Sequence, residues 1–299
     1  PGGARLATGA VSRVGVLATH RRRGVATGLM QALVRDADRR EFALMSLRAS
    51  EATIYERFGF GLAGEFCAID LLPKQARPIR GAATDGTFRM LRPGEIVDVL
   101  PDLYDRVAFT RPGVIERPVS WWPRLFKSAI KSDKPSFVVV HTDADGVDDG
   151  FVHYETAWDE EHPDGPTGKG EVFDLYATTP GVELALWRYI CDVDLVTRWK
   201  AFERPVDDVL RHACHNVRAY RVRSFEDEQW VRLVDVDAAL AGRTYRQVDG
   251  SIRVAVTDPL LPTNDGTYEI APHGAKRTDA PDADIVTDIA GLSAAYLGG

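Results

Sequence analysis

The 299-residue chain has little that would mark an extracellular, membrane-spanning or nucleic-acid-binding protein. Its three cysteines, Cys67, Cys191 and Cys214, are odd in number and scattered, which argues against a disulfide framework. No apolar run approaches the roughly 20 residues that a membrane-spanning helix needs, and no signal peptide is visible. With 44% hydrophobic and 27% charged residues, the chain can bury a large core, and we expect two or three cytoplasmic domains.

The balance of charge is positive only in the first part of the chain. Residues 1–70 hold ten Arg against seven Asp or Glu, a balance of +3. The whole chain has a net charge of −7, so residues 71–299 carry −10. An acidic remainder argues against a nucleic-acid partner and favours attraction of cationic amines, although an acidic surface also serves solubility. The positive part therefore indicates where an anionic ligand would bind.

The basic part centres on residues 14–26, Val-Gly-Val-Leu-Ala-Thr-His-Arg-Arg-Arg-Gly-Val-Ala. We interpret it as a strand that ends in a basic turn and leads directly into a helix. Backbone N–H groups at a helix start have no intrahelical partner, and the helix dipole favours negative charge there. Gly24 permits close approach of a bulky group. This turn is therefore a candidate phosphate site.

The residues that follow alternate between helix and strand signals. A stripe of Val25, Leu29, Leu33 and Ala37 predicts an amphipathic helix of about four turns. The apolar run 42–47 predicts a buried strand, residues 51–58 a second helix, and residues 65–72 a further strand.

The remaining chain repeats a similar layout at lower definition. Residues 73–86 have the composition of a linker. Strands are expected at 137–141, 150–157 and 171–177, with a loop at 159–170 and a helix over 180–193, whose start carries no Arg cluster. A third segment opens near Ser224 with a strand, a helix around 237–241 and a hairpin turn at Asp249-Gly250.

Two blocks of sequence resemble one known family. Arg21-x-x-Gly24-x-Ala26 is similar to the acyl-CoA pyrophosphate loop of the GNAT N-acetyltransferases. Residues 49–61, Ala-Ser-Glu-Ala-Thr-Ile-Tyr-Glu-Arg-Phe-Gly-Phe-Gly, resemble the signature of the enhanced intracellular survival (Eis) subgroup. The sharp similarity covers roughly residues 11–66, and a weaker similarity in segment order continues beyond them.

The resemblance implies a mixed α/β (α+β) fold in three parts. These are a partial acetyltransferase domain over residues 1–72, a second, degenerate GNAT-like domain over 87–223, and the start of a sterol-carrier-protein-like domain over 224–299. We expect the second domain not to bind CoA. Because family chains extend further at both ends, we expect this sequence to be a fragment, with a complete compact variant as the alternative.

The resemblance also implies a set of site residues. Acetyl-CoA would be the acyl donor, with no metal required. We expect the residues that contact it to lie in the strand, the basic turn, the helix start and the second block: Val14, Val16, Arg21, Arg22, Arg23, Gly24, Val25, Ala26 and Ser50. Ser50 is equally well explained as the N-cap of the helix at 51–58.

Tyr55 is the predicted general acid. A phenol, with a reference pKa of about 10, can give its proton to an alkyl thiolate, whose conjugate thiol has a reference pKa of about 8.5, as the C–S bond breaks. The alternative is a core tyrosine with a polar tip. The resemblance assigns the general base to a terminal carboxylate that this sequence lacks, so we expect poor turnover from it.

The implied activity is acetyl transfer to primary amines of aminoglycoside-like polyamines or of lysine, in a protein that forms homo-oligomers, as hexamers, at full length. The alternatives are a non-catalytic module that binds acyl-CoA or a lipid, and an oligomeric scaffold. The group His212-Ala-Cys214-His215 is a poor metal site, because its side chains fall on different helix faces and lack a distant second pair.

Overall fold

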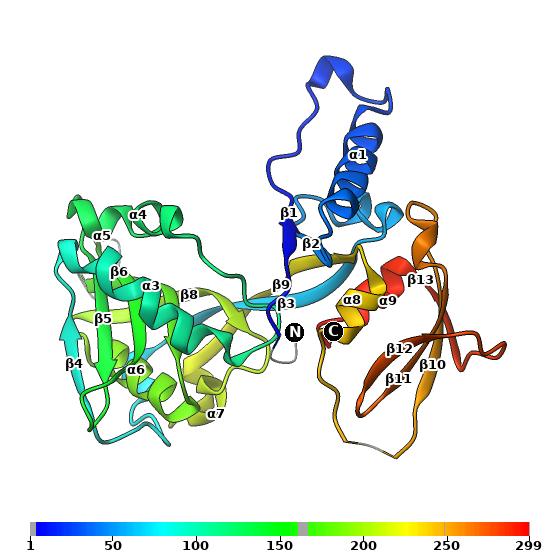
Figure 1. Ribbon diagram of the computed structural model, residues 1–299. Helices are drawn as coiled ribbons and strands as arrows, with labels where there is room; N and C mark the ends of the chain where they lie inside the picture. Colours follow the sequence, from blue (N-terminus) through cyan, green and yellow to red (C-terminus); the bar gives the residue numbers. More distant parts are fainter. Residues whose placement is uncertain (1–3, 161–166, 248, 299) are drawn as a thin grey trace. The chain divides into compact units, whose positions relative to one another are not determined.

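The computed structural model describes residues 4–160, 167–247 and 249–298. Figure 1 colours the chain from blue to red along the sequence. Its contacts divide it into two compact units. Unit 1 combines residues 1–65 with 227–299, and unit 2 comprises residues 66–226. These units group residues differently from the three predicted sequence domains, which stay a prediction.

Unit 1 contains a few strands of one mixed sheet and a second, four-stranded sheet from the end of the chain. In the first, β1 pairs in parallel with β2, and β2 pairs antiparallel with the end of β9. The second has the order β12-β11-β10-β13. The elements are β1 (Thr8–Ala10), α1 (Val25–Arg39), β2 (Leu44–Leu47), the start of β3 (Gly61–Leu71), the end of β9 (Tyr220–Leu233), α8 (Val236–Ala241), β10 (Ile252–Thr257), β11 (Gly266–Ala271), β12 (Gly274–Thr278), β13 (Ile285–Asp288) and α9 (Ile289–Ala295).

Unit 2 is built on a mixed sheet in which α6 connects the parallel pair β7 and β8. Its strand order is β9-β3-β8-β7-β6-β5-β4. The elements are the end of β3, α2 (Pro73–Ala76), β4 (Thr87–Met90), α3 (Ile96–Val107), α4 (Trp122–Leu125), α5 (Lys127–Lys131), β5 (Ser136–Thr142), β6 (Asp148–Asp159), β7 (Thr167–Ala177), α6 (Pro180–Asp192), β8 (Val196–Pro205), α7 (Leu210–Ala213) and the start of β9. The strands and the helix predicted between 137 and 193 are present. The loop predicted over 159–170 is wrong at residues 167–170, which belong to β7, and its residues 161–166 lie outside the described ones.

Helix α1 is confirmed, but its predicted apolar stripe is buried only at Ala37. The buried residues are Met30, Val34 and Ala37, whereas Val25 and Leu29 keep 40% and 44% of their surface exposed. A helix turns about 100° per residue, so a repeat of four drifts by about 40° at each step. Residues at i, i+4 and i+7 stay on one side and form the packed face.

The strand predicted at Val14 and Val16 is also wrong. The strand β1 is limited to Thr8–Ala10, and the last backbone bond to β2 runs from the Val11 N–H to the Ser46 carbonyl, at 2.9 Å. A β-strand needs a partner for its backbone groups. Among the described residues, no strand pairs with residues 12–17, so this segment is irregular.

Three further local predictions differ from the structure. Residues 51–58 form two 3₁₀ turns, η2 (Ala52–Ile54) and η3 (Glu56–Phe58), and Ser50 caps neither of them. The predicted hairpin turn at Asp249-Gly250 is wrong, because Gly250 follows a segment that is not a strand and leads into β10. A tight hairpin instead joins β11 to β12 across residues 272–273. The predicted linker contributes Ala76 and Ile79 to the core of unit 2, because its apolar side chains pack against α6 and β8.

A fully buried ion pair lies at the centre of unit 1. Arg232 of β9 donates two hydrogen bonds to Asp258, at 3.0 and 2.9 Å, and neither side chain is exposed. Asp258 also accepts from Leu260 N, Leu261 N and Asn264 Nδ2. The carboxylate therefore ties β9 to the segment that follows β10.

We predict that Asp258→Ala lowers the free energy of unfolding by about 3–5 kcal/mol, because it leaves the Arg232 charge buried without a partner. Chemical denaturation followed by tryptophan fluorescence measures this. The control is Lys276→Ala, which breaks a pair with Glu269 whose lysine is 72% exposed; its expected cost is below about 1 kcal/mol. Equal losses in the two variants would contradict the assignment.

A second prediction concerns His153 in the core of unit 2. Burial lowers the pKa of this imidazole below its usual 6.5, and the nearby Asp174 and Glu155 only partly oppose that effect. The unfolded chain therefore binds a proton that the folded protein excludes when the pH lies below about 6.5 and above the folded pKa. The stabilisation is complete above that range and is lost as the pH falls through it.

The midpoint of urea unfolding should consequently decrease from pH 7 to pH 5. This pH dependence should be weaker in His153→Gln, whose amide still reaches the Ser136 hydroxyl that lies 3.0 Å from the ring. The exposed His215→Gln is the control and should keep the wild-type dependence. A wild-type slope in His153→Gln would contradict this origin.

Candidate functional site

The start of α1 borders a cavity of about 330 Å³ in unit 1, which we call the α1 hollow. The first turn of the helix, the preceding basic turn and one residue of η3 form its wall. The residues that line it are Val16, His20, Arg21, Arg22, Gly24, Val25, Ala26, Thr27 and Arg57.

Gly24 determines how the helix begins at this cavity. It is the N-cap residue, with φ of +77°, in the left-handed region that a side chain disfavours. An added Cβ would meet nothing within 4 Å, so the conformation rather than crowding calls for glycine here. Its carbonyl accepts the first helical bond, from Gly28 N at 2.9 Å.

No side chain caps this helix start, and its first turn contains no acidic residue. The N–H groups of Val25, Ala26 and Thr27 precede the first intrahelical donor, Gly28. Such groups carry the positive end of the helix dipole. An anion in the α1 hollow would accept hydrogen bonds from them.

The side chains around the hollow reinforce this preference. Arg21, Arg22 and Arg57 are exposed basic residues in its wall, and no Asp or Glu belongs to it. Guanidinium groups match phosphate oxygens in shape and charge. The α1 hollow therefore has the chemistry of a site for a phosphate-bearing ligand.

The structure brings together most, but not all, of the predicted cofactor residues. Six of the predicted set line the hollow: Val16, Arg21, Arg22, Gly24, Val25 and Ala26. Val14 and Arg23 lie in the same segment but outside the lining, and Ser50 is exposed away from it. Their contact with a cofactor stays a prediction.

Tyr55 lies between the two turns of the second sequence block. Its side chain is 8% exposed and packs edge-on against Phe60, with ring centroids 6.2 Å apart. It does not line the α1 hollow, although Arg57 of the following turn does. The burial is compatible with a core tyrosine as well as with an acid that a bound cofactor would reach.

Three residues of the lining were missed from the sequence: His20, Thr27 and Arg57. His20 precedes the arginines and Thr27 follows Ala26, so a wider window around the loop motif would have included them. Arg57 is distant in sequence, and only the fold of η3 brings it beside the basic turn. Its position within the second sequence block was the available signal.

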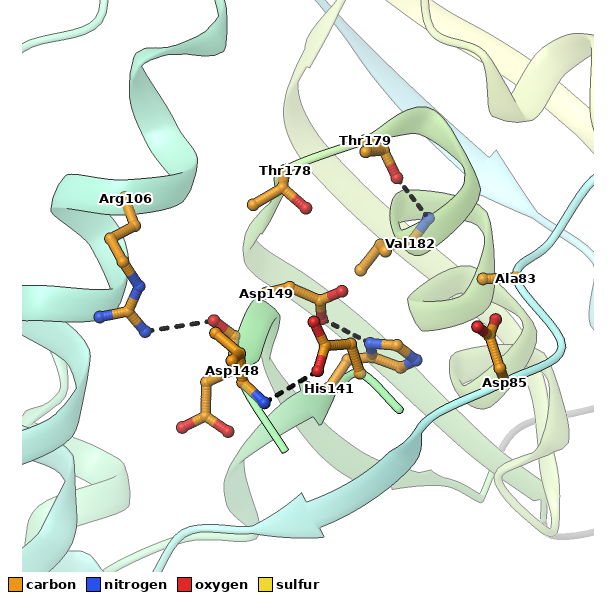
Figure 2. Close-up of a pocket in the computed structure, with 11 residues that line it drawn as sticks. Ala83, Asp85, Arg106, His141, Asp148, Asp149, Thr178, Thr179 and Val182 are labelled. Atoms are coloured by element: carbon orange, nitrogen blue, oxygen red, sulfur yellow. Dashed lines mark hydrogen bonds and ion pairs between the residues drawn. The ribbon is translucent and has the colours of Figure 1, made fainter. Parts of the chain in front are cut away.

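Unit 2 contains a contrasting cavity of about 480 Å³ at the start of α6 (Figure 2), which we call the α6 hollow. Here the N-cap Thr179 accepts from Val182 N at 3.3 Å, so the helix satisfies one of its own donors. The lining includes four aspartates, Asp85, Asp143, Asp148 and Asp149. His141 and Asp149 are paired at 2.6 Å. Aspartates outnumber the basic side chains in this wall, which disfavours a phosphate; that this part does not bind CoA stays a prediction.

Within residues 4–160, 167–247 and 249–298, no group of three or more His, Cys, Asp or Glu is arranged to hold a metal ion. No helix in the same ranges has the length and apolar character needed to cross a membrane.

Comparison with known sequences finds one family repeatedly. Family models described as "Acetyltransferase (GNAT) domain" match residues 1–63 and 113–233, and a "Sterol carrier protein domain" model matches residues 236–299. An uncharacterized N-acetyltransferase of Streptomyces coelicolor is 36% identical over 309 residues, covering 100% of this chain and 73% of the relative. The N-acetyltransferase Eis of Mycobacterium tuberculosis is 31% identical over 310 residues, covering 100% and 72%.

Comparison with solved structures agrees. Eis1 from Mycobacterium abscessus superimposes with a TM-score of 0.89 at 35% identity, covering 100% of this chain and 75% of that one. A GCN5-related N-acetyltransferase from Anabaena variabilis has a TM-score of 0.84 at 20% identity, which shows a shared fold. It covers 99% of this chain and 74% of that one.

We predict that Arg22→Ala weakens acetyl-CoA binding about tenfold, since it removes a charge-assisted contact to phosphate. Titration calorimetry measures the change. The affinity of the unmodified protein should also fall with added salt, and less steeply in the variant. The control is Arg35→Ala, an exposed arginine further along α1. An unchanged Kd for Arg22→Ala would exclude a role for this arginine.

Proposed function

The chain belongs to the Eis-like GNAT N-acetyltransferases, and we propose on this basis that it transfers the acetyl group of acetyl-CoA to a primary amine, with the α1 hollow as the cofactor site. The observation that carries this proposal is the hollow itself. It joins an uncapped helix start to three arginines in the part of the chain that matches the first GNAT model. GNAT acetyltransferases use acetyl-CoA as the acyl donor.

The pyrophosphate of the cofactor would lie against the first turn of α1. The amides of Val25, Ala26 and Thr27 would donate to its oxygens, and Arg21 and Arg22 would neutralise its charge from outside. Val16 lines the α1 hollow and is not part of a strand, so no sheet hydrogen bonds fix the direction of its N–H and carbonyl groups. We assign to this segment the contact with the pantetheine arm.

The chemical step is an acyl transfer. The nitrogen of a neutral amine attacks the thioester carbonyl carbon, a C–N bond forms, and the C–S bond breaks as the tetrahedral intermediate collapses. Tyr55 would donate its hydroxyl proton to the departing thiolate, which leaves as the CoA thiol. The amine loses a proton to a base that the described residues do not identify.

The acceptor is proposed to be a cationic polyamine, such as an aminoglycoside, or a lysine side chain. Support comes from charge: residues 71–299 carry a net charge of −10, against +3 in the basic first 70 residues. Such a field attracts polycations towards the protein, while the arginines attract the anionic cofactor. The identity of the amine is left to a substrate screen.

Tyr55→Phe tests the general acid. We predict a fall in kcat by about 10²–10⁴ with little change in acetyl-CoA affinity, because phenylalanine keeps the packing against Phe60 but cannot donate a proton. Release of the CoA thiol with an aminoglycoside acceptor measures kcat, and calorimetry measures the affinity. Tyr245→Phe, which removes a hydroxyl bonded to the Leu240 carbonyl, is the control.

An unchanged kcat in Tyr55→Phe would remove Tyr55 from the mechanism and make it a core tyrosine. Acetyl-CoA binding without acetyl transfer to any amine would instead favour the alternative of a non-catalytic acyl-CoA-binding module.

A further inference from the structure

The Tyr55 turn, residues 55–60, is a closed unit in which backbone and ring are held together. The Tyr55 carbonyl accepts from Phe58 N at 2.9 Å and from Phe60 N at 3.4 Å. The Tyr55 ring packs edge-on against the ring of Phe60, which is fully buried. A displacement of residues 58–60 would therefore move Tyr55 with it.

The two glycines of this block have almost no space around them. Gly59 has φ of +84°, and an added Cβ would lie 2.7 Å from Cγ2 of Ile289 and closer still to Nη1 of Arg232. At Gly61, an added Cβ would lie 2.7 Å from Cα of Ala294 and closer still to the Ala290 carbonyl oxygen. These distances are below ordinary van der Waals separation, so both positions require glycine.

The atoms that crowd these glycines belong to two elements from the far end of the chain. They come from α9, Ile289–Ala295, and from Arg232 on β9. Both elements are firmly held, because Ser293 of α9 accepts from Leu233 N at 3.1 Å and Arg232 is bonded to Asp258. The backbone at Gly59 and Gly61 thus packs against two elements that are hydrogen-bonded to other parts of unit 1.

We propose that α9 and Arg232 form a platform that positions the Tyr55 turn for acetyl transfer, with Ile289 and Arg232 as positioning residues. This inference rests on the proposed role of Tyr55 as general acid. The segment that matches the sterol-carrier-protein model is then a working part of the acetyltransferase site. A separate lipid-binding module would need no such close approach.

The test is Ile289→Ala, which removes the methyl group facing Gly59. The control is Leu292→Ala on the same helix, a buried leucine that is not among the atoms nearest to either glycine. We expect Ile289→Ala to speed amide exchange at Phe58 and Phe60 at least tenfold relative to the amides of α1. It should lower kcat by a similar factor and leave the Kd of acetyl-CoA within about twofold. Leu292→Ala, as long as it is folded, should change neither the exchange at Phe58 and Phe60 nor kcat.

The same substitution in the Tyr55→Phe background supplies a readout that general destabilisation would not change. If α9 acts through Tyr55, Ile289→Ala should lower kcat no further there, because the group that it positions is already absent. An equal loss of kcat in both backgrounds, or unchanged exchange at Phe58 and Phe60, overturns the inference. Faster exchange with no effect of Tyr55→Phe on kcat keeps the platform and overturns the catalytic role of Tyr55 instead.

Discussion

The Arg232–Asp258 pair is the interaction on which the rest of unit 1 depends. Burying two charges costs several kcal/mol per ion unless each is matched by hydrogen bonds, and Asp258 satisfies this with Arg232, Asn264 and two backbone amides. Asn264 also donates to the Val234 carbonyl and accepts from Val236 N. Arg232 Nε has no hydrogen-bond partner among the described groups, so the guanidinium is not fully hydrogen-bonded. The geometry of the two bonds to Asp258 is what holds the pair together.

This arrangement connects stability with chemistry. Arg232 lies against Gly59, and Gly59 belongs to the Tyr55 turn. The residues that would carry out acetyl transfer and those that resemble a sterol carrier domain therefore share one compact unit. In unit 2, by contrast, the start of α6 has a self-capping threonine and aspartates where the start of α1 has an uncapped glycine and arginines. The two helix starts thus differ in charge and also in backbone conformation, because Gly24 is left-handed, with φ of +77°, and Thr179 is extended, with φ of −138°.

Features that depend on neighbouring residues could be predicted from the sequence. The turn at Gly24 and the start of α1 follow from local backbone chemistry, and the family resemblance from the same short blocks. The buried face of α1 was predicted wrongly because a repeat of four drifts around the helix. The prediction of a strand at Val14 and Val16 was wrong because strand formation there would need backbone pairing with β2, about 30 residues away. Nothing near Gly59 and Gly61 in the sequence shows that α9, more than 200 residues later, crowds them, so this contact could not be predicted.

Hydrogen exchange with and without acetyl-CoA tests most directly whether the α1 hollow is the cofactor site. A cofactor bound there should slow exchange of the Val25, Ala26 and Thr27 amides, which would donate to the pyrophosphate. The amides of Gly181, Val182 and Glu183, at the equivalent turn of α6, should exchange at the same rate with and without the cofactor. Protection at α6 in place of α1, or no protection at either helix start when acetyl-CoA is saturating, would contradict this assignment.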